Sequence, residues 1–226
     1  MRKIVTAALA LFLLMCLAGF AMMQGSAEEE DHKTADTVRQ ETEGAEDVRE
    51  EENTGTAYTV DTPISEVTND PVFGDYGRLI FPVDTWYYSG DTLGDLGLTW
   101  YSHIDPDETV EIVNNLRNRA EAGETVFYDI YTEEEKAEDP EKEDTGLFFF
   151  KGTPGEKFAV CNAGGGFAYV GAMQDSFPHA LELSKKGYNA FALIYRPGAQ
   201  TACEDLARAI SFIFEHAEEL EVDTDC

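Results

Sequence analysis

Three consecutive glycines, Gly164, Gly165 and Gly166, are the residues of this chain best suited to chemistry through the backbone. Glycine forfeits conformational entropy on folding and has no side chain to pack, so a run of three needs a specific reason. A loop of this kind lets backbone N–H groups approach a ligand closely. In acyl transfer the carbonyl oxygen becomes an oxyanion, and losing one preorganised N–H donor to it raises the barrier by about 2.7–4 kcal/mol.

The glycine run has two alternative roles besides acyl transfer. Glycine-rich turns before helices also hold phosphate groups. However, the chain contains neither G-x-G-x-x-G nor G-x-x-x-x-G-K-[ST]. The next predicted helix also begins about ten residues after the glycines, whereas helix and glycines coincide in dinucleotide sites. A tight turn with a purely structural role is the remaining alternative.

Cysteine and histidine residues supply no second chemical centre in the sequence. Cys161, Cys203 and Cys226 have no C-x-x-C spacing and no histidine at the spacing of a metal ligand, so we predict neither a metal site nor a disulfide framework. Cys203 lies in the first turn of a predicted helix, without a nearby histidine to activate the thiol. His179 and His216 fall in predicted helices, where packing or surface roles are far more common.

The elements around the glycines alternate between strand and helix. Residues 158–161 form a short apolar strand that leads directly into the glycine run. A helix follows, with Ser176 as its expected cap, Pro178 in its first turn and Gly187 as its stop. Residues 190–195 are a continuous apolar run, the pattern of a parallel strand that is buried on both faces.

The last predicted element is an amphipathic helix. Residues 201–204, T-A-C-E, have the pattern of a capping box. Apolar residues then recur at spacings of three and four along one face, and they are Leu206, Ala209, Ile210, Ile213, Phe214, Ala217 and Leu220. The alternation predicts an α/β fold with a mainly parallel sheet and helices on both faces.

Upstream of the glycines the pattern is less regular. Asp105 precedes a proline and an acidic residue in a capping arrangement, and apolar spacing then predicts a helix over 106–122. Residues 125–131 and 147–150 are rich in β-formers. The charged residues 133–144 between them are predicted to be an exposed loop.

The N-terminus indicates the compartment. Arg2 and Lys3 precede an apolar run, and small residues up to Ala27 suit signal peptidase, so we predict a signal peptide over 1–27 and export from the cell. Two alternatives stay open. Residues 4–23 are long enough to span a membrane as an uncleaved anchor, and Cys16 would be the lipid attachment site of a lipoprotein. Either would give a cell-surface protein in place of a secreted one.

The net charge of the chain argues against polyanionic partners. The 226 residues hold 45 Asp and Glu against 16 Lys and Arg, a net charge of −29, and such a field repels nucleic acid and anionic lipid. Twelve of the acidic residues lie in residues 28–52, which have too few apolar residues to fold. We therefore predict a disordered acidic linker over 28–56, an aromatic-rich segment over 57–146 and an α/β segment over 147–226.

The residues from 157 onward resemble the α/β-hydrolase family, especially secreted esterases and lipase-like enzymes related to feruloyl and acetyl-xylan esterases. Residues 163–167, A-G-G-G-F, are similar to the H-G-G-G-F motif that ends a strand in that family, with Ala163 at the histidine position. The family also has a strand ending in Tyr-Arg, like residues 194–197, and a turn before the nucleophile strand, like residues 222–225. The resemblance implies that Gly165 and Gly166 are oxyanion donors.

The same resemblance implies a serine nucleophile in a G-x-S-x-G elbow, yet none of the seven serines has that context. We expect the elbow within about fifteen residues after Cys226, on a strand that pairs with 190–195, and the acid and histidine farther on. The implied activity is hydrolysis of a small-molecule or carbohydrate ester without a cofactor, which this chain alone lacks the residues to perform. The alternative is an exported binding protein that keeps the scaffold without its chemistry.

Overall fold

The computed structural model describes residues 57–81, 87–98 and 104–225. The described residues all belong to the second of the chain's two units, Glu51–Cys226. The signal peptide and the linker predicted over 1–56 lie outside the described residues. Within the described residues, no helix is long and apolar enough to cross a membrane.

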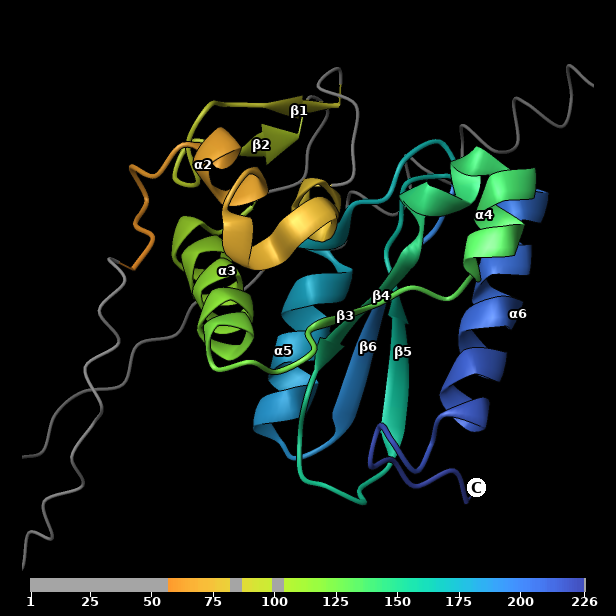
Figure 1. The fold of residues 1–226 in the computed structure, drawn as a ribbon. Helices are drawn as coiled ribbons and strands as arrows, with labels where there is room; N and C mark the ends of the chain where they lie inside the picture. The colour runs from red at the N-terminus through yellow and green to blue at the C-terminus, as the bar shows by residue number, and fades with distance from the viewer. Residues whose placement is uncertain (1–56, 82–86, 99–103, 226) are drawn as a thin grey trace, which may run out of the picture. The chain divides into compact units, whose positions relative to one another are not determined.

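A four-stranded sheet occupies the centre of the second unit (Figure 1). Its strands are β3 (Phe127–Tyr128), β4 (Gly146–Phe150), β5 (Phe158–Asn162) and β6 (Asn189–Ile194), in the order β3-β4-β6-β5. Strand β4 is antiparallel to both of its neighbours, while β5 and β6 are parallel.

The described sheet is therefore mixed, whereas the sequence pattern predicted a mainly parallel one. The physical reason lies in the connections. A parallel pair needs a crossover of a dozen or more residues, and a helix supplies it between β5 and β6. The chain between β4 and β5 is a short loop, so these two strands run in opposite directions.

Strand β6 lies in the interior of the sheet. All six of its residues are buried, as expected from the apolar run. The prediction that a strand from beyond Cys226 would pair with it is wrong, because β4 and β5 already occupy its two edges. Strand β5 lies at one end of the sheet and pairs with β6 along one of its two edges. Next to its other edge is an isolated parallel bridge between Lys157 and Asp223.

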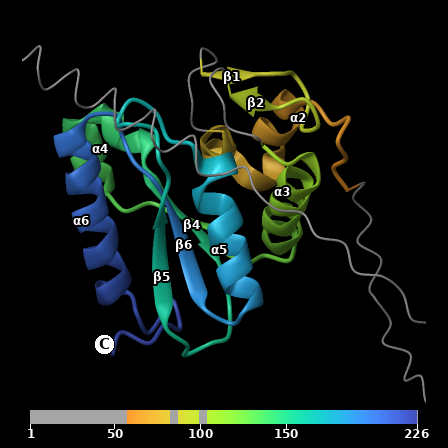
Figure 2. The ribbon, with the colours of Figure 1, turned by 180° about the vertical axis from the view of Figure 1, so that it is seen from behind.

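Helices α5 (Ser176–Lys185) and α6 (Ala199–Glu215) cover opposite faces of the sheet (Figures 1 and 2). Consecutive residues of a strand point to opposite faces. On β4, Phe148 packs against a phenylalanine of α5 with ring centroids 5.1 Å apart. Its neighbour Phe149 stacks on Phe191 of β6 on the other face. Helices thus lie on both faces of the described sheet.

Both helix starts differ from the sequence prediction. The cap position of α5 is Asp175, and Ser176 is the first helical residue. Helix α6 begins at Ala199, after Gly198 with φ of +107°, so Thr201 lies inside the helix and forms no cap. Glycine tolerates this positive φ, and it lets the chain enter the helix without a side-chain cap.

The first part of the unit packs beside α5. It contains α2 (Ile64–Thr68), η1 (Pro71–Ile80), a two-stranded ribbon of β1 (Tyr88–Ser89) and β2 (Gly97–Leu98), and α3 (Pro106–Glu121). Helix α3 has the predicted bounds to within one residue. The Asp105 carboxylate accepts hydrogen bonds from the first-turn N–H groups at 2.9 and 3.1 Å, as the capping pattern predicted.

The charged residues predicted as a loop are partly helical. Helix α4 (Glu133–Glu138) and the 3-10 helix η2 (Pro140–Asp144) link β3 to β4. A capping box between Thr132 and Glu135 starts α4, which explains why so acidic a segment forms a turn of helix. Neither α4 nor η2 contains a buried residue.

Candidate functional site

The glycine run lies where two parallel strands end. Strand β5 ends at Asn162, and the loop of residues 163–171 leads through η3 (Ala172–Gln174) into α5. Because β5 and β6 are parallel, their carboxyl ends meet at one edge of the sheet. Ligands of α/β proteins bind outside this edge, so the loop is in a suitable position to contact one.

Backbone geometry explains why this loop needs glycine. Gly165 has φ of +149°, and a Cβ atom there would lie 1.9 Å from the carbonyl oxygen of Tyr169. Gly166 and Phe167 follow with φ of +61° and +60°, and the Ala168 N–H donates to the Gly165 carbonyl oxygen at 3.0 Å. Two successive residues with positive φ are typical of a type I′ turn. Phe167 is a bulky residue in this region, which stores strain of the kind found at functional sites.

The Tyr195 side chain ties the two sides of the loop together. Tyr195 follows β6 and is buried. Its hydroxyl is 2.8 Å from the carbonyl oxygen of Ala163 and 3.3 Å from that of Tyr169. Burial raises the pKa of Tyr195, with smaller contributions from Asp175 and Tyr169, so the hydroxyl stays protonated and remains a donor at neutral pH.

Two further hydrogen bonds connect the loop to residues of neighbouring segments. The Asp175 carboxylate accepts a hydrogen bond from the Gly164 N–H at 2.7 Å. The Gly198 N–H donates to the carbonyl oxygen of Phe167, also at 2.7 Å. The loop is therefore fixed from the end of β6, from the cap of α5 and from the start of α6.

The fixed loop leaves backbone donors available. Among the described residues, the N–H groups of Gly165, Gly166 and Phe167 donate to no acceptor. Gly166 and Phe167 are exposed, and Gly165 is half-buried. Both glycines proposed from the sequence as oxyanion donors are thus in one turn with unused N–H groups, and Phe167 adds a third donor that the sequence pattern did not single out.

A pocket of about 540 Å³ adjoins the loop at the same edge of the sheet. Its walls come from the loop, from the end of β6, from η1 and from η2. Tyr87 and Tyr169 stack in it with ring centroids 4.6 Å apart. The remaining lining residues are Arg78, Leu79, Phe81, Asp144, Ala168, Val170, Ile194, Tyr195 and Pro197.

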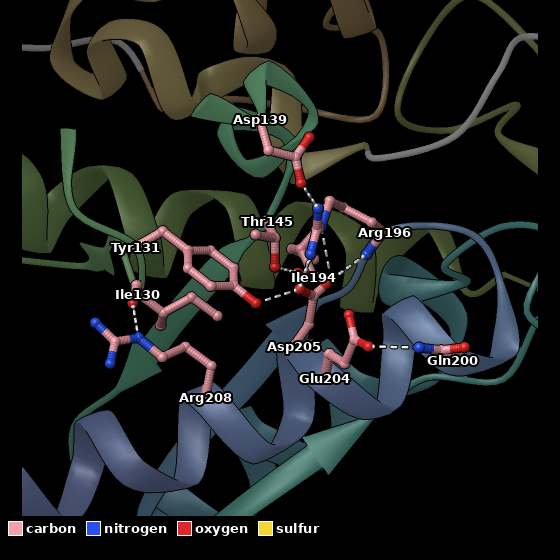
Figure 3. Close-up of polar contacts among 10 residues, drawn as sticks. All are labelled: Ile130, Tyr131, Asp139, Thr145, Ile194, Arg196, Gln200, Glu204, Asp205 and Arg208. Carbon is pink, nitrogen blue, oxygen red and sulfur yellow. Dashed lines mark hydrogen bonds and ion pairs between the residues drawn. The ribbon is translucent and has the colours of Figure 1, made fainter. Parts of the chain in front are cut away.

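The chain just after β6 is held by a buried ion pair (Figure 3). Arg196 donates to both carboxylate oxygens of Asp205, with the shortest contact 2.7 Å long. Tyr131 donates its hydroxyl to the same carboxylate at 2.8 Å. Hydrogen bonding to Asp205 raises the pKa of Arg196, so the guanidinium stays charged. This pair fixes the direction in which Tyr195 and Gly198 leave the strand.

The other candidate side chains do not form a catalytic set in the described residues. His179 is exposed and lies 3.3 Å from Asp175, the cap residue of its helix, and His216 lies 3.1 Å from Glu219. Burial, with a smaller contribution from Asp175, raises the pKa of the Cys161 thiol, which makes it a poor nucleophile. Cys203 is exposed. No group of three or more His, Cys, Asp or Glu side chains in the described residues could hold a metal ion.

Comparisons with protein-family models, with curated proteins and with solved structures find no match to this chain.

Replacing Tyr195 by Phe tests the role of its hydroxyl in the loop. The buried carbonyl of Ala163 would lose its donor, so we expect the free energy of unfolding to fall by about 1–3 kcal/mol. Amide hydrogen exchange over residues 163–169 should accelerate. Tyr188→Phe is the matched control because Tyr188 is 44% exposed, and it should change neither quantity. Unchanged loop exchange in Tyr195→Phe would show that the other bonds suffice.

Proposed function

We propose that this chain carries the oxyanion loop of an exported carboxylic-ester hydrolase of α/β-hydrolase type. A serine oxygen adds to the ester carbonyl, and the carbonyl electron pair moves onto its oxygen. The N–H groups of Gly165 and Gly166 stabilise that oxyanion. Collapse of the intermediate expels the alcohol and leaves an acyl group on the serine. Water then hydrolyses this acyl-serine and releases the carboxylic acid product. The serine, the histidine that takes its proton and the acid that orients the histidine are not among these 226 residues.

The observation that carries the proposal is a turn held by several hydrogen bonds, with unused donors of its own. Three backbone N–H groups in succession have no acceptor in the described residues, while their turn is fixed by Tyr195, Asp175 and Gly198. Donors that are already in place cost no reorganisation when charge develops. The turn lies at the carboxyl edge of the sheet, where ligands of α/β proteins bind.

The position of the loop in the chain supports the same interpretation. In α/β-hydrolases one oxyanion donor comes from the loop between the third strand and the following helix. Strand β5 is the third of the four strands in chain order, and its loop leads to α5. The adjoining pocket would hold part of a small-molecule or carbohydrate ester.

The edge of β5 offers a place for a nucleophile strand. After α6 the chain returns to this edge, where the Asp223 N–H donates to the Glu156 carbonyl oxygen at 3.0 Å and the bridge to Lys157 is parallel. A strand that continued this pairing would end at the same sheet edge as the glycine loop. A serine at its end would then lie near the proposed donors.

Ester hydrolysis tests the proposal in two steps. The 226-residue chain should hydrolyse p-nitrophenyl acetate no faster than an inert protein, because no serine has an elbow context. Turnover that a serine-directed inhibitor abolishes would contradict this. The gene's uninterrupted reading frame should contain the elbow after Cys226 and should hydrolyse the ester. A natural stop codon directly after Cys226 would overturn the esterase proposal.

The loop itself is tested in that longer protein by Gly166→Ala. An alanine at Gly166 meets no atom within 4 Å, so the change introduces backbone strain without a collision. Gly155→Ala is the matched control, since Gly155 also has positive φ and open space. We expect Gly166→Ala to lower kcat at least about tenfold, as for a disturbed oxyanion donor, and Gly155→Ala to leave it unchanged. Equal effects would refute a role for the loop.

A second candidate function is strand-mediated binding without catalysis. It is favoured by one observation, the apolar surface beside the edge of β5. Ile210 and Phe214 of α6 are 39% and 50% exposed, and the Phe214 ring contacts Phe158 of β5. An extended peptide could pair with such an edge. A reading frame without a serine elbow would favour this function.

A further inference from the structure

An acidic segment between β3 and β4 is attached to the fold mainly by charge. We call residues 132–144, which include α4 and η2, the strap. Residues 133–144 contain eight Asp and Glu and two Lys, and neither helix of the strap has a buried residue. Because apolar burial is the main force that holds most elements in place, this segment needs another form of attachment.

Three arginines from three different elements supply that attachment. Arg78 of η1 pairs with Asp144 and donates to the Glu143 carbonyl oxygen at 2.7 Å. Arg196, which follows β6, pairs with Asp139 at 2.9 Å, as Figure 3 shows. Arg208 of α6 lies 3.5 Å from Glu135.

The two lysines of the strap, one in α4 and one in η2, also contact charged or aromatic side chains. Lys136 pairs with Asp129 at 3.0 Å, and the Lys142 ammonium lies 4.9 Å from the centroid of the Tyr131 ring. The carboxylates in the three arginine pairs have exposed fractions of 35–59%. Salt weakens the Arg78–Asp144 pair most, because both of its side chains are exposed, and weakens the pair of the 5% exposed Arg196 least.

The strap forms part of the walls of two pockets. Asp144 lines the pocket of about 540 Å³ beside the glycine loop, together with Arg78. Glu133, Lys136 and Glu143 line a second pocket of about 320 Å³, which Arg78 also borders. Moving the strap away from Arg78 would therefore open the wall between η1 and η2 in both pockets.

We propose that the strap is an ionic latch, closed at low ionic strength by Arg78, Arg196 and Arg208 and released as salt screens these pairs. The surplus of acids in the strap favours release, because the rest of the chain is also strongly acidic and repels it. Opening the latch widens access to the pocket beside the glycine loop. The latch depends on the ion pairs and pocket walls alone, so it stands whether or not the chain is part of an esterase.

Hydrogen exchange of the full chain at low and high salt tests the latch. Raising NaCl from about 0.02 to 0.5 M shortens the screening length severalfold. We expect amide exchange over residues 133–144 to accelerate by about tenfold, as for the loss of several exposed pairs, while exchange in α3 changes little. Equal acceleration in both segments, or none in the strap, would overturn the proposal.

Single substitutions identify the pairs that close the latch. Arg78→Gln and Asp144→Asn should each accelerate strap exchange by about two- to fivefold at low salt. The double variant should resemble Arg78→Gln, because that change alone already removes both the pair with Asp144 and the bond to the Glu143 carbonyl oxygen. Lys151→Gln is the matched control, since it removes a pair of similar exposure with Glu221, 2.7 Å long and outside the strap. An equal effect of Lys151→Gln on the strap would show that net charge, and no specific latch, controls it.

Discussion

Asp205→Asn is expected to lower the free energy of unfolding by about 3–5 kcal/mol, because it removes the buried counter-charge of the Arg196 guanidinium and leaves only the exposed carboxylate of Asp139. The Asp205 side chain is fully buried, and that of Arg196 is 5% exposed. The carboxylate also accepts bonds from the Arg196 backbone N–H at 2.8 Å and from the Tyr131 hydroxyl. Asparagine keeps the size of the side chain, so packing changes little and the loss reports the charge and its hydrogen bonds.

Asp139→Asn provides the control, since Asp139 pairs with the same guanidinium at 2.9 Å and its side chain is 40% exposed. Water screens and replaces an exposed partner, so this variant should lose about 1 kcal/mol or less. Urea unfolding followed by circular dichroism measures both differences. Similar losses in the two variants would mean that Arg196 is solvated well enough to tolerate the loss of Asp205.

Phe148→Ala should cost about 3–5 kcal/mol, the range for removing a large buried ring. Phe148 of β4 is fully buried. Its ring contacts those of Phe127, Phe177 and Tyr76 at centroid distances of 5.0, 5.1 and 6.0 Å. The cavity would therefore lie where the sheet, α5 and η1 meet, and the surrounding rings belong to three elements that cannot all move inward.

Phe214→Ala is the same substitution at an exposed position. The Phe214 side chain is 50% exposed, so its loss should reduce the free energy of unfolding by less than about 1 kcal/mol. Urea unfolding of both variants, with the same slope against denaturant, provides the comparison. A large loss in Phe214→Ala would indicate that another surface covers this residue in solution.

Local signals predicted most of the helices and strands. Helix α3 was readable because Asp105, a first-turn proline and apolar spacing all indicate the same start. The apolar runs of β4, β5 and β6 were also visible. The apolar spacing predicted the body of helix α6 but not its start. The helix begins after Gly198, which has a positive φ, and the T-A-C-E pattern that suggested a cap lies inside the helix.

Local sequence patterns could not predict contacts between residues that are far apart in the chain. The position of β6 between β4 and β5 depends on pairings across the whole sheet, so an apolar run could not show which strand lies at the edge. The glycine loop was predicted as a donor site from its residue types. Its anchors were missed, because Tyr195 is 32 residues from Ala163 in the chain and no local motif links them.

The order of the strands also constrains how this sheet can assemble during synthesis. The strand at its centre, β6, is the last of the four to leave the ribosome. Until it arrives, β4 and β5 have been made but share no hydrogen bonds, since each pairs with β6 and not with the other. Gly146 pairs with Ile194, a contact that closes a long loop and is costly to form early. A nascent chain that ends before β6 therefore exposes two largely apolar strands with unpaired edges, which is when it would most depend on chaperones.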